Sequence, residues 1–239
     1  MEQQDILSMT LPELQAAVQE LGEPKFRAKQ IFNWLHQKRV TDFSEMTTLS
    51  LPFRERLASD FCINRLKIAK RLASSVDDTV KYLYELPDGN YVETVCMQYH
   101  HGTSLCISTQ VGCRMGCRFC ASAIAGFVRN LTPAEMLLQI YETERAQNCK
   151  ISSLVLMGIG EPLDNFDNVL RFLQLLSDPN GYGMSLRHVT VSTCGVVPKI
   201  LELAEQRLGL TLSVSLHCPN DAGRSAIMPI NRSYPIDVL

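Results

Sequence analysis

From residue 104 to residue 216 the sequence alternates short apolar runs with amphipathic stretches, and this alternation constrains the fold more than any other feature. The apolar runs predict strands over 104–109, 152–158, 188–193 and 210–216. The stretches between them predict helices over 133–147, 165–178 and 197–208. Because strands that alternate with helices pair in parallel through right-handed crossovers, we predict an α/β fold with a partial (β/α) barrel.

The chain before residue 101 has a different pattern. Thr10 and Glu13 have the spacing of a capping box at the start of one helix, and a second helix is predicted to begin at Pro24. Alternating runs over 80–86 and 91–99 flank a Pro-Asp-Gly-Asn turn, which predicts a β-hairpin. We therefore expect three regions: a small helical domain over 1–70, a hairpin linker over 71–100 and the barrel over 101–239.

The segment 24–39 has no acidic residue and carries a group of basic ones, namely Lys25, Arg27, Lys29, Lys38 and Arg39. This pattern fits an RNA-contacting face and an ordinary solvated helix surface equally well. A net charge of -2 predicts no strong general attraction to nucleic acid. Any RNA binding would therefore depend on a local patch such as this one.

Cysteine usage bears on the compartment. The N-terminus lacks a basic segment followed by an apolar core, and no apolar run approaches the roughly 18 residues that a membrane span needs. We therefore expect a cytoplasmic protein that does not contact a membrane. Thiols stay reduced in that compartment, and an odd number of cysteines, here nine, cannot pair completely, so the cysteines do not indicate a disulfide framework. Some of the cysteines are then expected to serve metal or redox chemistry.

Polar, glycine or cysteine residues gather just after each predicted strand. The first strand is followed by Cys113, Cys117 and Cys120, and the later strands by 158–162, 192–195 and 215–217. In parallel barrels the active site is built from the loops at the carboxyl ends of the strands. The four groups are therefore predicted to converge on one site.

The spacing Cys113-x-x-x-Cys117-x-x-Cys120 places three thiols on one short loop, where a single metal centre can collect them. Three thiolates hold only three corners of a 4Fe-4S cubane, whereas an electron-transfer cluster is held by four. The remaining iron is then free to bind the amino and carboxylate groups of S-adenosylmethionine (SAM).

Structural zinc is the competing interpretation of this loop. Zinc accepts thiolates at similar spacing but requires four protein ligands, and the fourth would come from His100, His101, Cys96 or Cys106. A zinc-stabilised RNA-binding protein without chemistry would leave the three later groups without a role.

The whole set of motifs resembles the RlmN family of radical SAM enzymes. The resemblance lies in LCISTQVGCRMGCRFCASAIAGFVRNLTPAEM, VLMGIGEPLDN, HVTVSTCGVVP and SVSLHCPND, and it runs over nearly the whole chain. It implies a radical SAM barrel, a 4Fe-4S cluster and SAM as cofactors, and methylation of adenosine C2 in 23S rRNA and tRNA through a methyl-cysteine intermediate and a 5'-deoxyadenosyl radical. An electron donor such as flavodoxin and a monomeric state are also expected.

The resemblance also implies roles for single residues. Gly160, Glu161, Ser192, Ser215, Leu216 and His217 are expected to contact SAM. Glu93 matches the acid-base carboxylate of the family, although a strand glutamate is ordinarily only solvated. Cys106 matches the cysteine that resolves a covalent protein-RNA intermediate by forming a disulfide, although its pattern alone suggests a buried core thiol.

Two expectations concern differences from the family. The methyl-carrying cysteine and a further SAM-binding asparagine lie near the C-terminus of RlmN proteins, and the resemblance implies that neither is among the residues up to Leu239. The chain is therefore expected to bind a cluster without completing methyl transfer, in a barrel that is incomplete at its C-terminal end. Within the enzyme class, a Cfr-like methyltransferase that acts at adenine C8 is the alternative.

Overall fold

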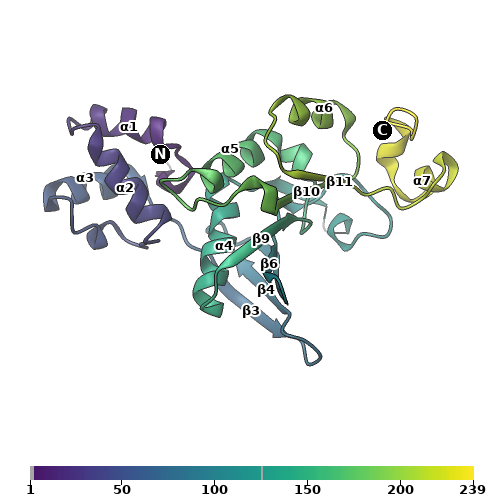
Figure 1. Ribbon diagram of the computed structural model, residues 1–239, viewed down its shortest axis with the longest axis horizontal. Coiled ribbons are helices and arrows are strands. Elements are labelled where there is room, and N and C mark those ends of the chain that lie inside the picture. The colour runs from purple at the N-terminus through teal and green to yellow at the C-terminus, as the bar shows by residue number, and fades with distance from the viewer. Residues whose placement is uncertain (1–2, 125) are drawn as a thin grey trace.

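The computed structural model describes residues 3–124 and 126–239. Within them, the main sheet has seven strands in the order β11-β10-β9-β6-β5-β4-β3 (Figure 1). The strands from β3 to β6 pair antiparallel, whereas β6, β9, β10 and β11 pair in parallel. The bounds are β3 (Lys67–Ala73), β4 (Val80–Glu85), β5 (Tyr91–Tyr99), β6 (Gly102–Cys106), β9 (Ile151–Leu156), β10 (Val189–Thr193) and β11 (Thr211–Val214).

The predicted alternation of strands and helices is confirmed. The parallel strands are joined through α4 (Pro133–Gln147), α5 (Phe166–Ser177) and α6 (Val197–Glu205). The strands are shorter than predicted at several ends. The predicted start of β10 is a 3-10 turn, η5 (Leu186–His188), and β6 stops at Cys106, three residues early.

The predicted hairpin is present as β4 and β5, in register from Val80 opposite Cys96 to Glu85 opposite Tyr91. Since β5 also pairs with β6, the hairpin belongs to the same sheet as the parallel strands. The domain boundaries at 70 and 100 stay a prediction. The sequence did not predict β3, because all its residues are exposed on this sheet edge and show no apolar alternation.

The N-terminal helices are α1 (Leu11–Glu20), α2 (Phe26–His36) and α3 (Leu51–Asp60). The predicted capping box is confirmed, since the Thr10 N–H donates to the Glu13 carboxylate at 2.8 Å. Strand β1 (Gln4–Asp5) pairs with β2 (Phe61–Cys62), which closes this region on itself. Its buried side chains share one hydrophobic core with α4 and α5.

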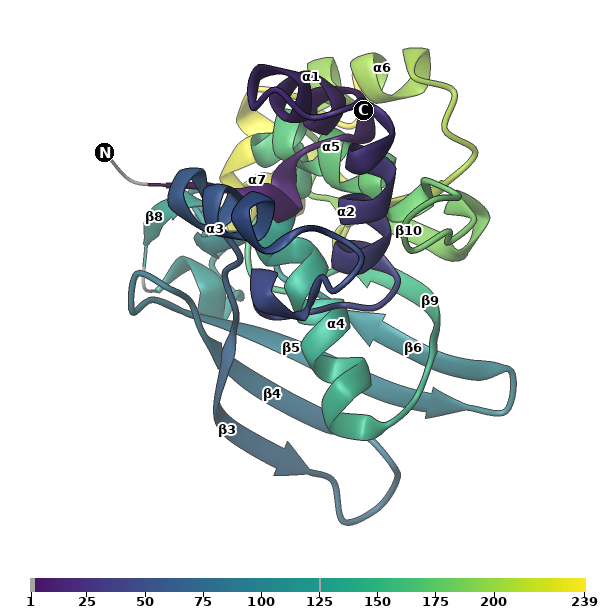
Figure 2. The ribbon, with the colours of Figure 1, turned by 90° about the vertical axis from the view of Figure 1, so that its left-hand side faces the viewer.

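The two faces of the sheet differ. Helix α4 lies across one face (Figure 2), where Tyr84 and Thr94 hydrogen-bond to side chains of α4. Because successive strand residues alternate between faces, Glu93, Cys106 and Ser192 lie on the opposite face and are only half-buried. This open face is where a barrel interior would lie. No helix in the described ranges is long and apolar enough to cross a membrane.

Candidate functional site

The cysteine loop is held at its base by two short strands that the sequence did not predict. Strand β7 (Gln110–Gly112) precedes the loop and pairs antiparallel with β8 (Phe127–Asn130) behind it. The Cys113 N–H donates to the Gly126 carbonyl at 3.1 Å. Gly112 has a φ of +72°, and a Cβ there would lie 1.7 Å from that carbonyl oxygen. Only glycine therefore allows this close approach.

The loop has the donors that a thiolate-bound cluster needs. Cys113, Cys117 and Cys120 are half-buried and carry free thiols. Burial raises the pKa of Cys113 and Cys117, and the negative charge of the neighbouring thiols and of Glu161 raises it further. A raised pKa favours the protonated thiol, whereas a bound cation would favour the thiolate. In residues 3–124 and 126–239 no three metal-binding side chains are placed to hold a single metal ion, whereas a cubane takes one thiolate at each of three irons.

Glu161 follows β9 and is almost completely buried, with 4% of its surface exposed. Its carboxylate accepts the backbone N–H of Leu163 at 3.1 Å and that of Cys194 at 2.7 Å. Burial raises the pKa of Glu161, and these hydrogen bonds oppose that effect. The carboxylate thus joins the end of β9 to the end of β10. SAM contact by Glu161 and Gly160 stays a prediction.

Gln110 is a residue that the sequence analysis missed. It is fully buried, and its side-chain oxygen accepts the Glu161 N–H at 2.8 Å. Its amide nitrogen donates to Asn130 and to Asp164, each at 2.8 Å. Asp164 in turn pairs with Arg114 of the cysteine loop at 2.9 Å. The available signal was its position in the sequence, because Gln110 lies directly between the predicted strand 104–109 and the cysteine loop.

The predicted SAM contacts on the last two strands lie close together. The Ser192 and Ser215 hydroxyls are 3.4 Å apart, and the Ser215 N–H donates to the Thr193 carbonyl at 2.9 Å. Leu216 is exposed, and the His217 ring packs on Phe119 of the cysteine loop with ring centroids 4.4 Å apart. The structure therefore brings this segment to the cysteine loop.

Glu93 and Cys106 lie on adjacent strands of the open face. Val95 is the direct partner of Cys106, so Glu93 is its diagonal neighbour, a relationship that typically spans ~7–8 Å between Cα atoms. The Glu93 carboxylate is 2.5 Å from the Lys81 ammonium, and both side chains are partly exposed. Burial raises the pKa of Cys106. The sequence analysis did not identify Lys81.

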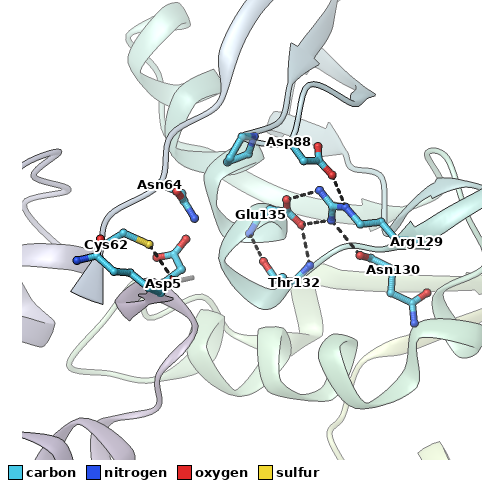
Figure 3. Close-up of a pocket in the computed structure, with 10 residues that line it drawn as sticks. Asp5, Cys62, Asn64, Asp88, Arg129, Asn130, Thr132 and Glu135 are labelled. Carbon is cyan, nitrogen blue, oxygen red and sulfur yellow. Dashed lines mark hydrogen bonds and ion pairs between the residues drawn. The ribbon is translucent and has the colours of Figure 1, made fainter. Parts of the chain in front are cut away.

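Other charges near the site are neutralised within the protein. Figure 3 shows Arg129 between Asp88 and Glu135, with nitrogen-to-oxygen distances of 2.6 Å and 2.8 Å. These residues line a cleft of about 740 Å³ that also includes Asp5 and Cys62 from the N-terminal region. None of the predicted site residues lines it.

One of the five basic residues in segment 24–39 is neutralised by an ion pair within the protein. Arg39 pairs with Glu144 and lies beside the Tyr141 ring, whereas Lys25, Lys29 and Lys38 stay exposed. RNA contact by these lysines remains a prediction.

Comparisons with known proteins agree with this arrangement. Residues 4–63 match the ribosomal RNA large subunit methyltransferase N-terminal domain, and residues 107–238 match the radical SAM superfamily. A probable dual-specificity RNA methyltransferase RlmN from Lachnoclostridium phytofermentans is 52% identical, over 98% of this chain and 66% of that protein. The corresponding protein from Alkaliphilus oremlandii is 49% identical, over 100% of this chain and 69% of that protein.

The fold comparison agrees as well. A crystal structure of a radical SAM methyltransferase from Sphaerobacter thermophilus matches with a TM-score of 0.92 and 37% identity. The match covers 99% of this chain and 70% of that one. The chain thus spans about two thirds of the length of the curated relatives it matches. On the sequence matches and the shared fold, this chain belongs to the RlmN family of the radical SAM superfamily.

Proposed function

We propose that this protein takes part in radical SAM methylation of adenosine C2 in 23S rRNA and in tRNA. The observation that carries the proposal is the placement of Glu93 and Cys106 on one open face of the sheet, as diagonal neighbours on adjacent strands. Family membership supports the same chemistry.

In this proposal Cys113, Cys117 and Cys120 hold a 4Fe-4S cluster, and SAM binds beside it. When bound, the cluster supplies the single electron that starts radical chemistry on SAM. The strand-end residues contribute short polar groups and close backbone approach for the cofactor, namely Gly160, Glu161, Ser192, Ser215, Leu216 and His217. The buried Glu161 acts through the backbone amides that it holds in place.

Glu93 and Cys106 complete the methyl transfer. Lys81 forms an ion pair with the Glu93 carboxylate and orients it, so that it can take the C2 proton of adenine. The Cys106 thiolate attacks the sulfur of the methyl-carrying cysteine and forms a disulfide with it. The bond from that sulfur to the carbon on adenine breaks, its electron pair stays with the carbon, and the carbon takes up a proton to become the methyl group. We also infer a cytoplasmic monomer that receives electrons from a donor such as flavodoxin.

Anaerobic reconstitution with iron and sulfide tests the cluster. We expect about four irons per chain, loss of iron when all three loop cysteines are replaced by Ala, and retention in Cys149→Ala, which removes a thiol outside the loop. The reconstituted chain should reductively cleave SAM. Tightly bound zinc without iron uptake would refute the proposal.

The position of methylation is tested in cells that carry the complete gene. Ribosomal and transfer RNA are digested to nucleosides, and the methyladenosines are separated and identified by mass spectrometry. We expect 2-methyladenosine in both RNAs, and its loss with Cys106→Ala. The detection of 8-methyladenosine instead would favour the Cfr-like alternative.

A further inference from the structure

Arg224 is a buried cation that the sequence analysis did not identify. It lies in α7 (Asp221–Ile227) and has 1% of its surface exposed. Its guanidinium donates to the Asn231 side chain at 2.7 Å and to the Cys194 carbonyl at 2.5 Å, and its Nε has no hydrogen-bond partner. In the described part of the chain, no carboxylate lies within ion-pair distance of it.

Such a side chain is costly. The guanidinium stays charged at all physiological pH values, and a buried charge without an opposite charge loses its hydration free energy. A neutral amide and a carbonyl, together with the attraction of the exposed Asp221 carboxylate from beyond ion-pair distance, return only part of that loss. The arrangement therefore needs a compensating anion or a functional reason.

The surroundings of Arg224 indicate where that anion would be. The Arg118 N–H, one residue after Cys117, donates to the carbonyl of Ile227, the last residue of α7, at 2.9 Å. Cys194 ties the helix to the other side of the site, because its own N–H donates to Glu161. Helix α7 therefore packs directly against the loop that carries the thiols.

The backbone of Cys194 binds side chains of opposite charge at its N–H and at its carbonyl. Glu161 accepts its N–H and Arg224 donates to its carbonyl. The Cys194 thiol has a raised pKa, mainly through burial and the charge of Glu161, with smaller effects of Cys117 and Cys113. The electrostatic effects of the loop thiols thus reach the residue that Arg224 binds.

We propose that Arg224 is a positioning residue that fixes Cys194 at the end of β10 and, through its buried charge, makes the cluster on the cysteine loop easier to reduce. The inference rests on the proposed cluster. Three thiolates make that cluster anionic, and a further electron adds negative charge in a region of low dielectric. A fixed cation nearby lowers the free energy of the reduced state.

The test is a redox titration of the reconstituted protein under anaerobic conditions, followed by electron paramagnetic resonance. Arg224→Met removes the charge and keeps a long side chain. We expect about four irons per chain and a more negative midpoint potential. The ratio of reduced to oxidised cluster at a fixed potential should fall about tenfold, which corresponds to 59 mV for one electron. Arg232→Met, an exposed arginine in the following turn, is the matched control and should leave the potential unchanged.

A second variant keeps Arg224 itself. Asn231 donates to the Asp221 carboxylate at 2.8 Å. Exchanging the two, as Asp221→Asn with Asn231→Asp, conserves net charge and moves the carboxylate onto the guanidinium. We expect the same negative shift, whether or not Arg224→Met folds. Unchanged potentials in the exchange variant or in a folded Arg224→Met would overturn the inference, whereas absence of iron from the unmodified protein would instead overturn the proposed cluster.

Discussion

The side chain of Gln110 binds the backbone of Glu161 at 2.8 Å, across 51 residues of sequence. This hydrogen bond joins the strand before the cysteine loop to the loop after β9. The amide nitrogen of Gln110 adds Asn130 and Asp164 to the same network. One buried side chain therefore sets the distance between two parts of the site.

Gln110→Ala should destabilise the protein by about 2 to 4 kcal/mol, because it leaves buried polar groups unpaired and opens a cavity. Gln174→Ala, at an exposed position of α5, should change stability by less than about 0.5 kcal/mol. Urea denaturation of both variants provides the measurement. Equal effects of the two changes would show that the Gln110 network does not stabilise the fold.

Gly112→Ala should separate β7 from β8, because the new methyl group would collide with the Gly126 carbonyl. Gly209 is a matched control, since it has a similar φ of +68° and no atom within 4 Å of the added Cβ. Gly209→Ala should cost only the backbone strain of roughly 1–2 kcal/mol. We expect Gly112→Ala alone to lose iron uptake in reconstitution, at a temperature where both variants are folded by circular dichroism. Full iron uptake by Gly112→Ala would contradict this prediction.

Glu93→Gln should leave the fold intact, because its ion pair with Lys81 is partly exposed and such pairs contribute about 0–1 kcal/mol. In cells that carry the complete gene, Glu93→Gln should lower RNA methylation by roughly 10²–10⁴-fold, which is the usual contribution of a general base. Glu85→Gln, on the neighbouring strand β4, is the control and should retain methylation. The yield of 2-methyladenosine per RNA molecule measures both. Normal methylation with Glu93→Gln would rule out the acid-base role.

His36 should make the protein sensitive to acid. Burial lowers the pKa of His36 from 6.5 to about 4, so the unfolded chain binds a proton in this interval that the folded chain does not. The contribution of His36 to the free energy of unfolding therefore falls as pH falls from about 6.5 to about 4, by on the order of 3 kcal/mol in total. His36→Asn should flatten the dependence of unfolding free energy on pH between 4.5 and 7, measured with urea, whereas the exposed His188→Asn should not. Parallel curves for the His36 variant and the unmodified protein would contradict this assignment.

Local patterns in the sequence were sufficient for helices α1, α2, α4, α5 and α6, the parallel strands, the hairpin and the cysteine loop, but not for α3 and α7. The capping box at Thr10 and the apolar periodicity of α4 act over a few residues, so their signals survive without tertiary information. The strands β3, β7 and β8 were missed. They are short or exposed, and they exist because a partner strand supplies their hydrogen bonds.

The sequence alone determined the spacing of the three thiols that we propose hold a cluster, and which motifs follow each strand. Only the tertiary structure decided how those groups are placed. The antiparallel pairing of β5 with β6 makes Glu93 the diagonal neighbour of Cys106. Connections between the parallel strands bring Gln110 to Glu161 and Arg224 to Cys194. Such pairings depend on strand order and register, which join residues far apart along the chain. No periodicity within a single segment encodes them.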